Sequence, residues 1–307
     1  MSLARAVQLL TAQPVKTGTG RKAVELAPPT KAEATFALNY LEAFGYLKQS
    51  LAGWKDIKIE DVLAAVGLFQ SWFGLKKTLQ LDPATVKSME WPRCGHVDIH
   101  RDHHVHALKL KEQVNQNLAR WKKDGLTYGF ASFVPGLTAD VQRRLTAQAF
   151  EAWTRYGNID VKETTNSTAD IVIGTGQGAR SNFDGPGGTL AWAYLPDGND
   201  NQLEMRFDLG ETWTDDPASR GILYLNVATH EYGHLLGLDH SKVQSALMAP
   251  YYSPAVAVPQ QNDDIPRFQA RYGVRTAPPA NTPTPPARPK VVVTGDVEVT
   301  VNGRKVA

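Results

Sequence analysis

At roughly 150 residues per domain, the 307 residues of the chain suffice for about two domains. Hydrophobic residues make up 42% and charged residues 21%, a composition typical of a globular protein that excludes wholesale disorder, collagen and coiled coil. The 33 basic and 31 acidic residues leave a net charge of +2, which gives no reason to expect a nucleic-acid partner. No apolar run approaches the roughly 18 residues that span a bilayer, and the single cysteine excludes an intrachain disulfide.

The first 91 residues predict a loose leader followed by short helices. Residues 1–30 contain scattered prolines and glycines with weak apolar periodicity, so we expect a loosely ordered leader, and no signal peptide is visible there. Apolar residues recur at helical spacing in residues 31–44 and 59–73. A third helix starts at Asp82, an N-cap residue followed by proline. Together these helices predict a small all-α domain of three helices over residues 31–91.

The middle of the chain mixes strands and helices. A long amphipathic helix opens at Thr138, and a second helical pattern covers residues 221–236. Because strands and helices do not alternate strictly, residues 108–275 are predicted to form an α+β domain with a mixed, twisted sheet. Its strands are expected at residues 126–134, 169–174, 190–195 and 202–207.

The last 32 residues differ in composition from those before them. Six prolines fall within residues 277–289, which predicts a stiff, extended linker over residues 276–290. Residues 291–307 alternate apolar and polar positions and contain Asn302-Gly303, a two-residue hairpin signal. A segment this short does not fold alone, so we expect either a docked edge hairpin or a disordered tail.

The strongest chemical signal is the segment HEYGHLLGLDH, which begins at His230. On a helix, His230 and His234 share one face and can bind the same metal ion. A sharp exit from the helix at Gly237 brings His240 round as a third ligand. Three imidazoles leave the fourth position of Zn²⁺ to water, which is typical of a catalytic site, and Glu231 is placed to act as the general base. The predicted reaction is hydrolysis of a peptide bond by zinc-bound water.

This segment resembles the zinc-binding motif of the metzincin metalloproteases, and Met248 resembles the methionine of the turn beneath the zinc in that clan. Residues 92–98 read PRCGHVD and resemble the cysteine switch of the matrix metalloproteinases, or matrixins, with valine where proline is usual. The resemblance implies that Cys94 binds the zinc in a latent proform, and that Arg93 pairs with Asp98 to hold the loop. It also implies a metzincin catalytic domain, preceded by a prodomain similar to peptidoglycan-binding domains.

Residues 92–107 would then contain the switch and an activation linker. Four histidines crowd this stretch, at positions 100, 103, 104 and 106. They are either metal ligands or part of a solvated, cleavable connector, and the sequence leaves both interpretations open. Cleavage between Asp98 and about Lys111 would release the mature enzyme.

Residues 183–191 resemble the loop of the family that binds calcium and borders the substrate. The resemblance implies at least one structural Ca²⁺, with a glycine-rich surface turn as the alternative. The implied calcium ligands are Asp184, Gly185, Gly187, Thr189, Asp208 and Glu211. Poor zinc ligands occupy the positions that would bind the family's second, structural zinc, so we predict a single zinc ion. These positions hold Gln177, Ala179, Trp192 and Arg206.

Leu190 and Ala191 resemble the edge strand that pairs with an extended substrate, while Pro250 and Tyr252 resemble the wall of the pocket for the residue after the scissile bond. The sequence therefore predicts a secreted, latent zinc endopeptidase that cleaves proteins or peptides. Its own prodomain is the expected inhibitor, and a separate protease the expected activator. The alternative is a non-catalytic protein that binds peptidoglycan through its N-terminal helices and retains a vestigial zinc site.

Overall fold

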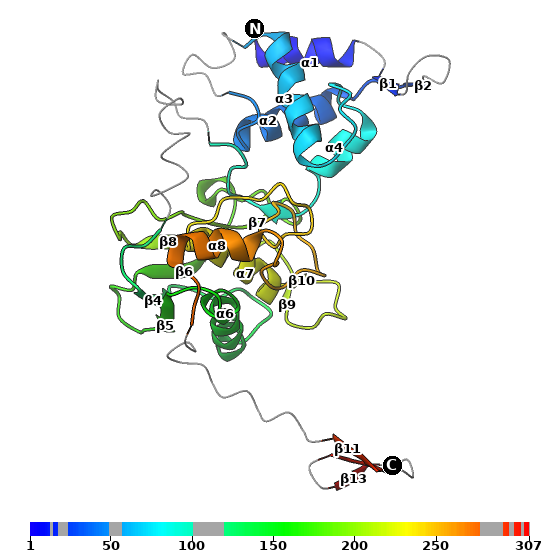
Figure 1. Cartoon of the computed structure of the whole chain (residues 1–307). Coiled ribbons are helices and arrows are strands. Elements are labelled where there is room, and N and C mark those ends of the chain that lie inside the picture. Colours follow the sequence, from blue (N-terminus) through cyan, green and yellow to red (C-terminus); the bar gives the residue numbers. More distant parts are fainter. Residues whose placement is uncertain are drawn as a thin grey trace. The chain divides into compact units, whose positions relative to one another are not determined.

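The computed structural model describes residues 1–12, 15–17, 24–48, 57–100, 120–276, 291–294, 298–301 and 304–306. The chain divides into two units, Met1–Arg275 and Thr276–Ala307 (Figure 1). The first unit contains two separate hydrophobic cores, one formed by the N-terminal helices and one by a sheet with its helices. None of the helices in the described part of the chain has the length and hydrophobicity needed to cross a membrane.

The N-terminal core has helices at all three predicted positions. Thr30 begins the first of them in a capping box with Glu33, and Asp82 caps the third. Leu38 and Phe69 are fully buried where the apolar faces of these helices meet. The helices are α2 (Lys31–Ala43), α3 (Ile59–Trp72) and α4 (Pro83–Met89).

A further helix, α1 (Leu3–Thr11), corrects the prediction of a loosely ordered start. Ser2 caps this helix by accepting a hydrogen bond from the Arg5 amide, and Ala6 and Val7 are buried in the same core as α2 and α3. A nine-residue helix is marginal by itself in water, so its stability comes from this tertiary packing, which the local sequence does not report. The short antiparallel strands β1 (Val15–Thr17) and β2 (Val24–Leu26) follow.

A six-stranded sheet of order β3-β7-β8-β6-β4-β5 organises the rest of the first unit. Strand β7 runs antiparallel to β8, whereas all other neighbours are parallel, so the predicted mixed sheet is confirmed. The strands are β3 (Arg93–Cys94), β4 (Gly125–Phe130), β5 (Asp160–Glu163), β6 (Ile171–Gly176), β7 (Thr189–Ala193) and β8 (Leu203–Asp208). A separate parallel pair consists of β9 (Trp213–Thr214) and β10 (Ile222–Leu223).

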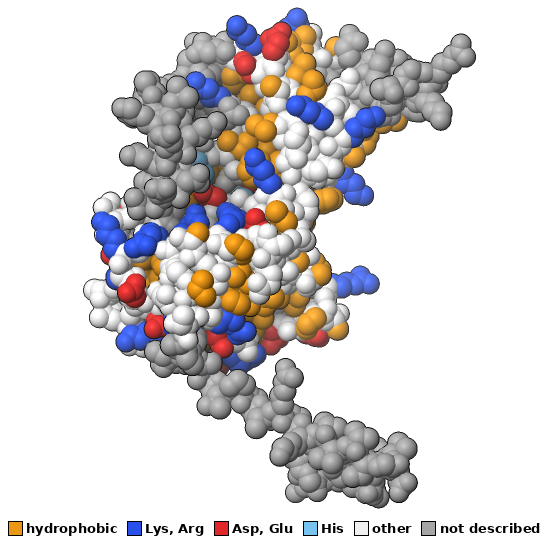
Figure 2. All heavy atoms as spheres, viewed as in Figure 1, with side chains coloured by type: hydrophobic (Ala, Val, Ile, Leu, Met, Phe, Trp, Pro, Cys, Tyr) orange, Lys and Arg blue, Asp and Glu red, His pale blue; other side chains and the backbone are white. Residues whose placement is uncertain are grey.

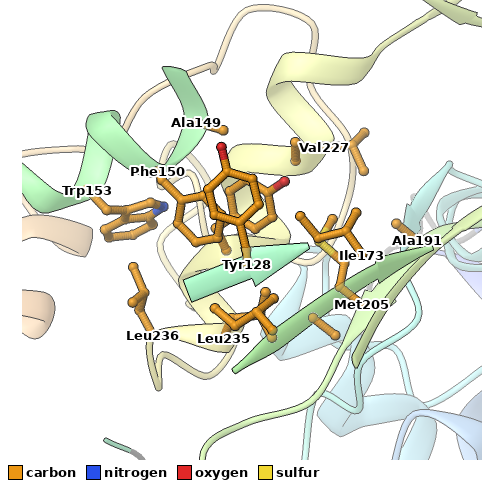
Figure 3. Close-up of a cluster of buried hydrophobic side chains, with 14 of the residues drawn as sticks. Tyr128, Ala149, Phe150, Trp153, Ile173, Ala191, Met205, Val227, Leu235 and Leu236 are labelled. Carbon is orange, nitrogen blue, oxygen red and sulfur yellow. The ribbon is translucent and has the colours of Figure 1, made fainter. Parts of the chain in front are cut away.

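Two long helices bury their apolar faces in the core of this sheet. Figure 3 shows Phe150 and Trp153 gathered with Leu235 and Leu236 in that core. The Trp153 indole Nε1 also donates to the carbonyl oxygen of Thr229 at 2.7 Å, which joins the two helices by a hydrogen bond. The helices are α6 (Ala139–Thr154) and α7 (Tyr224–Leu235), and α8 (Asp264–Tyr272) closes the unit. Helix α7, which carries the metal-binding motif, is therefore held rigidly.

Two element boundaries differ from the prediction by three residues or more. The strand expected over residues 126–134 ends at Phe130, because the side chain of Gln142 bonds both the amide and the carbonyl of Val134 and replaces strand pairing there. The helix expected over residues 221–236 starts only at Tyr224, since the preceding residues pair with β9.

The second unit is a three-stranded antiparallel sheet. Its strands are β11 (Val291–Thr294), β12 (Glu298–Val301) and β13 (Arg304–Val306). Val301 pairs with Arg304, and the predicted Asn302-Gly303 turn between them lies outside the described part of the chain. The proline-rich stretch over residues 277–290 also lies outside it.

Candidate metal centre and active site

Helix α7 carries three of the four functional residues predicted from the motif. His230, Glu231 and His234 lie on its last two turns and are buried. Gly237 has a φ of +95°, which a residue with a side chain rarely adopts, and its amide donates to the carbonyl oxygen of His234. The chain therefore leaves the helix abruptly, and His240 returns to the same place.

The three imidazoles converge with the sulfur of Cys94. One ligand atom from each of these four buried residues lies within 4.8 Å of the others. The Nδ1 atoms of His230 and His234 each bond a backbone carbonyl oxygen at 2.7 Å, that of Leu247 and that of Leu238. Because a carbonyl oxygen only accepts, both Nδ1 atoms carry the proton, and the Nε2 lone pairs face the centre.

The electrostatics of these imidazoles suit a metal ion. Burial lowers the pKa of His230 to about 4 and those of His234 and His240 well below their usual value, so all three are neutral. Within the described residues, His230 Nε2 and His240 Nε2 are buried without any hydrogen-bond partner. Unsatisfied buried lone pairs are costly, and a tetrahedral set of three neutral imidazoles and a sulfur fits Zn²⁺.

Cys94 reaches this centre on strand β3, which lies at the edge of the sheet and pairs with β7. The Cys94 sulfur lies 3.4 Å from His234 Nε2. The Cys94 amide donates to the carbonyl oxygen of Pro250 at 2.9 Å, and the next amide, that of Gly95, donates to Ala191 at 2.8 Å. Residues 93–95 thus bridge two of the predicted substrate-binding elements. Burial raises the pKa of the Cys94 thiol well above its usual value, so a cation is needed to hold it as the thiolate.

Arg93 and Asp98, the predicted supports of the switch, form a buried ion pair of 2.6 Å. The guanidinium also bonds the hydroxyl of Tyr40 and the carbonyl oxygen of Cys94. The Asp98 carboxylate accepts from Tyr46 at 2.7 Å and pairs at 2.7 Å with Nδ1 of a metal-ligand histidine, His240. Hydrogen bonds through Tyr46 and Asp98 therefore connect the helical core to His240, the third candidate ligand.

Glu231 is fully buried beside the candidate ligands. Burial raises its pKa to about 8, against a smaller opposing effect of Cys94. Neither carboxylate oxygen has a hydrogen-bond partner among the described residues. A buried carboxyl group that the fold does not satisfy, with a strongly perturbed pKa, is typical of a group that takes part in chemistry.

Met248 is buried close under α7. A side-chain carbon added to Gly233 would meet its sulfur at 2.2 Å, so the helix and the methionine turn approach each other as closely as a glycine permits. The carboxylate of Asp264 accepts hydrogen bonds from the Leu247 and Met248 amides at 2.7 and 3.1 Å and fixes this turn. Sequence reasoning missed Asp264, because its partners lie 16 and 17 residues away.

A small cavity opens beside Glu231. Apolar side chains form much of its lining, and the Tyr252 hydroxyl fixes one wall by accepting from the Leu223 amide at 3.1 Å. Of the four predicted substrate-binding residues, Leu190, Pro250 and Tyr252 line this cavity, while Ala191 lies on β7 next to the switch segment.

The predicted calcium ligands gather around the loop before β7. The Asp184 carboxylate accepts from the Thr189 amide at 2.8 Å, and the Glu211 carboxylate accepts from the Gly187 amide at 2.7 Å. Burial raises the pKa of Glu211, and the charges of Asp208 and Asp184 raise it further. Asp208 is completely buried, and among the described residues one of its oxygens has no partner. Crowded, partly unsatisfied carboxylates of this kind fit a hard cation. Positive φ angles at Gly185 (+94°) and Gly187 (+86°) shape the loop.

Two of the four positions that would bind the family's second zinc contact other protein groups here. Trp192 pairs with Arg206 across β7 and β8, and the Trp192 indole donates to the Ser181 carbonyl oxygen at 2.8 Å. Arg206 bonds the carboxylate of Glu204. Ala179 begins the short 3₁₀ helix η3 (Ala179–Ser181), directly after the Gln177-Gly178 pair.

A second cluster of metal-ligating atoms lies nearby. His96, His100 and Asp239 each offer one ligand atom within 4.8 Å of the others. Of the histidine-rich stretch noted in the sequence, His100 belongs to this cluster, and positions 103, 104 and 106 lie outside the described residues. His96 and Asp239 were not anticipated, although a histidine inside the switch sequence was a visible signal.

Fold and site together define a class of protein: a mixed sheet, a helix-borne histidine pair and a third histidine after a glycine turn are the arrangement typical of the metzincin zinc proteases. The matrixin family profile matches residues 120–273. Matrilysin of Rattus norvegicus is 34% identical over 244 residues, which cover 78% of this chain and 85% of that protein. Matrilysin of Homo sapiens is 33% identical, with 81% and 91% covered.

The chain belongs to the matrixin family. It is also similar to matrix metalloproteinase-19 of Mus musculus, with 34% identity over 260 residues, or 81% of this chain. The chain spans about half the length of that relative (45%).

Proposed function

We propose that this protein is the latent form of a zinc endopeptidase, in which Cys94 closes the metal site until the N-terminal helical part is removed. One observation carries the proposal: the only sulfur of a cysteine in the chain lies within 4.8 Å of the three candidate ligand nitrogens. A thiolate is a strong zinc ligand, so Cys94 would exclude water from a zinc ion held by the three histidines, and the closed protein would be inactive.

In the open enzyme, Glu231 acts as the general base. When bound, zinc supplies Lewis acidity that lowers the pKa of water and polarises a carbonyl group. Glu231 accepts a proton from the attacking water as the new bond to the carbonyl carbon forms. It then gives this proton to the amine nitrogen as the peptide C–N bond breaks. His230, His234 and His240 would hold the metal through Nε2, and their Nδ1 bonds keep the rings oriented.

Substrate binding would use the elements that the switch segment covers. The backbone of Leu190 and Ala191 on β7 offers an edge for an extended peptide, in the way that it now pairs with β3. The cavity beside Glu231, with Pro250 and Tyr252 in its lining, would take an apolar side chain after the scissile bond. Proteins or peptides are therefore the proposed substrates.

Latency would depend on the Arg93–Asp98 pair. Asp98 holds both the switch loop and His240, so the prodomain acts as an intramolecular inhibitor attached at two points of the site. An activating protease that cuts after Asp98 would release it. The family resemblance further supports action outside the cell, and a structural Ca²⁺ at Asp184, Asp208 and Glu211, where crowded carboxylates need a counter-charge.

Casein hydrolysis by the chain before and after limited proteolysis tests this proposal. We expect no activity in the intact chain, activity after loss of the helical part, and loss of that activity with a zinc chelator. The Glu231→Ala variant should be cut in the same way but remain inactive, whereas the surface variant Glu204→Ala should match the parent. If the parent and Glu231→Ala hydrolyse casein equally, the proposal fails and the peptidoglycan-binding alternative gains.

A further inference from the structure

The cluster of His96, His100 and Asp239 has the dimensions of a metal site. His100 Nε2 lies 2.8 Å from Asp239 Oδ1 and 3.3 Å from His96 Nε2, and His96 Nε2 lies 3.7 Å from the same carboxylate oxygen. Ligand atoms around a tetrahedral zinc ion, each about 2.0–2.2 Å from it, are separated by about 3.3–3.6 Å. The three atoms therefore bracket the spacing that one ion requires.

The chemistry of the donors agrees with that spacing. Two imidazole nitrogens and one carboxylate oxygen suit Zn²⁺, Co²⁺ and related divalent ions. The Arg267 guanidinium bonds the backbone oxygen of Asp239 at 2.6 Å and fixes its position.

The cluster is also accessible to an ion from solution. The side chain of His100 is 49% exposed and that of Asp239 34%, whereas that of His96 is 12% exposed and its ring lies 4.4 Å from the ring of His234. The three residues come from the two chain segments that meet at the switch. His96 and His100 follow Cys94 in the chain, and Asp239 precedes the metal-ligand His240.

We propose that His96, His100 and Asp239 bind a second divalent ion of the zinc type, which clamps the switch segment onto the loop that carries His240. The regulatory half of this inference rests on the proposed latency, whereas the metal site itself does not. A bound ion adds a connection that must break before Cys94 can leave its place, so filling the site slows opening of the switch.

Zinc counting on the full chain tests the site directly. The Glu231→Gln background keeps the precursor intact. After metal removal and reloading with increasing zinc, the parent should hold two zinc ions per chain, and His100→Gln and Asp239→Asn should each hold one. Asp215→Asn, at an exposed aspartate elsewhere, should hold two. One zinc in the parent, or two in both cluster variants, would overturn the proposal.

Loading with cobalt separates the two sites. A thiolate charge-transfer band reports only the ion at Cys94, so it should saturate at the first equivalent of cobalt and keep its amplitude in both cluster variants. Loss of this band in Asp239→Asn would mean that the substitution damages the first site instead, and would count against a separate second site.

The clamp is tested by alkylation of Cys94, the only cysteine. With iodoacetamide, the second zinc equivalent should slow alkylation of the parent at least threefold and leave both cluster variants unchanged. Equal rates in parent and variants would refute the clamp. None of these readouts needs hydrolysis, so an inactive mature protein would overturn the proposed function and leave this inference standing.

Discussion

Two buried polar clusters meet at the switch segment and differ in how their atoms are satisfied. Around Arg93 and Asp98, donors and acceptors bond one another, with Tyr40, Tyr46 and the Cys94 carbonyl completing the set. Around α7, atoms of His230, His240 and Glu231 are buried without partners among the described residues. In the first cluster, protein groups satisfy all of these hydrogen bonds. In the second, the buried atoms find partners only when a metal ion and a reactant are bound. A structural polar network thus satisfies its own hydrogen bonds, whereas a catalytic one leaves buried polar atoms without partners.

The comparison first predicts a large effect of metal removal. Zinc present at 1,000 times its dissociation constant stabilises the fold by about 4 kcal/mol, because only the folded chain gathers all of the ligands. Chelation should therefore lower the melting temperature of the intact precursor sharply, and added zinc should restore it. Differential scanning calorimetry with and without chelator gives the measurement. An unchanged melting temperature would mean that the second cluster is complete without metal.

Disrupting the cluster around Arg93 and Asp98 should reduce the free energy of unfolding somewhat less than metal removal does. Asp98→Ala removes one partner of a buried ion pair and should lower the free energy of unfolding by about 3 kcal/mol, because Tyr40 and the Cys94 carbonyl still accept from Arg93. Alkylation of Cys94 should accelerate as well. Asp215→Ala, at an exposed pair with Arg144, is the control and should change stability by less than about 0.5 kcal/mol. Equal effects of the two substitutions in urea unfolding would contradict the comparison.

The support beneath the second cluster is expected to matter less again. Asp264→Ala would leave three amides, those of Gln260, Leu247 and Met248, without their acceptor, at a cost of about 2 kcal/mol. The neighbouring Asp263→Ala, which loses only a half-buried pair with Arg267, provides the matched control. Urea unfolding should separate the two variants. A larger loss in Asp263→Ala would show that the methionine turn does not depend on Asp264.

The smallest expected effect lies far from both clusters, at Asp170. Burial raises the pKa of this half-buried carboxyl, but hydrogen bonds from Lys123 and Thr127 outweigh it and lower the pKa overall. A lowered native pKa means stabilisation that is present above the unfolded value of about 4 and lost as pH falls below it. Asp170→Asn should therefore destabilise by less than about 1 kcal/mol at pH 6, and the difference from the parent should shrink towards pH 3.5. A difference that grows on acidification in urea unfolding would refute this sign.

The sequence predicted those parts of the site that depend on local spacing. His230 and His234 share a helix face because they are four residues apart, and Gly237 marks the turn to His240. It could not predict contacts made by the fold, such as the bond between Asp98 and His240, which are 142 residues apart. Helix α1 was missed for the same reason, since only burial against α2 and α3 stabilises it.

The cluster of His96, His100 and Asp239 was predictable from the sequence in one part and not in the other. Density of histidine after the switch suggested a metal site, but not which residues take part, because the carboxylate comes from a loop about 140 residues later. The resemblance to the matrixin switch located Cys94 and Arg93. The way the sulfur approaches the ring of His234 became visible only in three dimensions.

X-ray absorption at the zinc edge of the intact precursor, loaded with one equivalent of zinc, tests the central claim most directly. The account predicts one sulfur ligand at about 2.3 Å and three imidazole nitrogens at about 2.0–2.1 Å, with the sulfur lost once Cys94 is alkylated. A first shell of nitrogen and oxygen alone, in a precursor whose cysteine is unmodified, would contradict it.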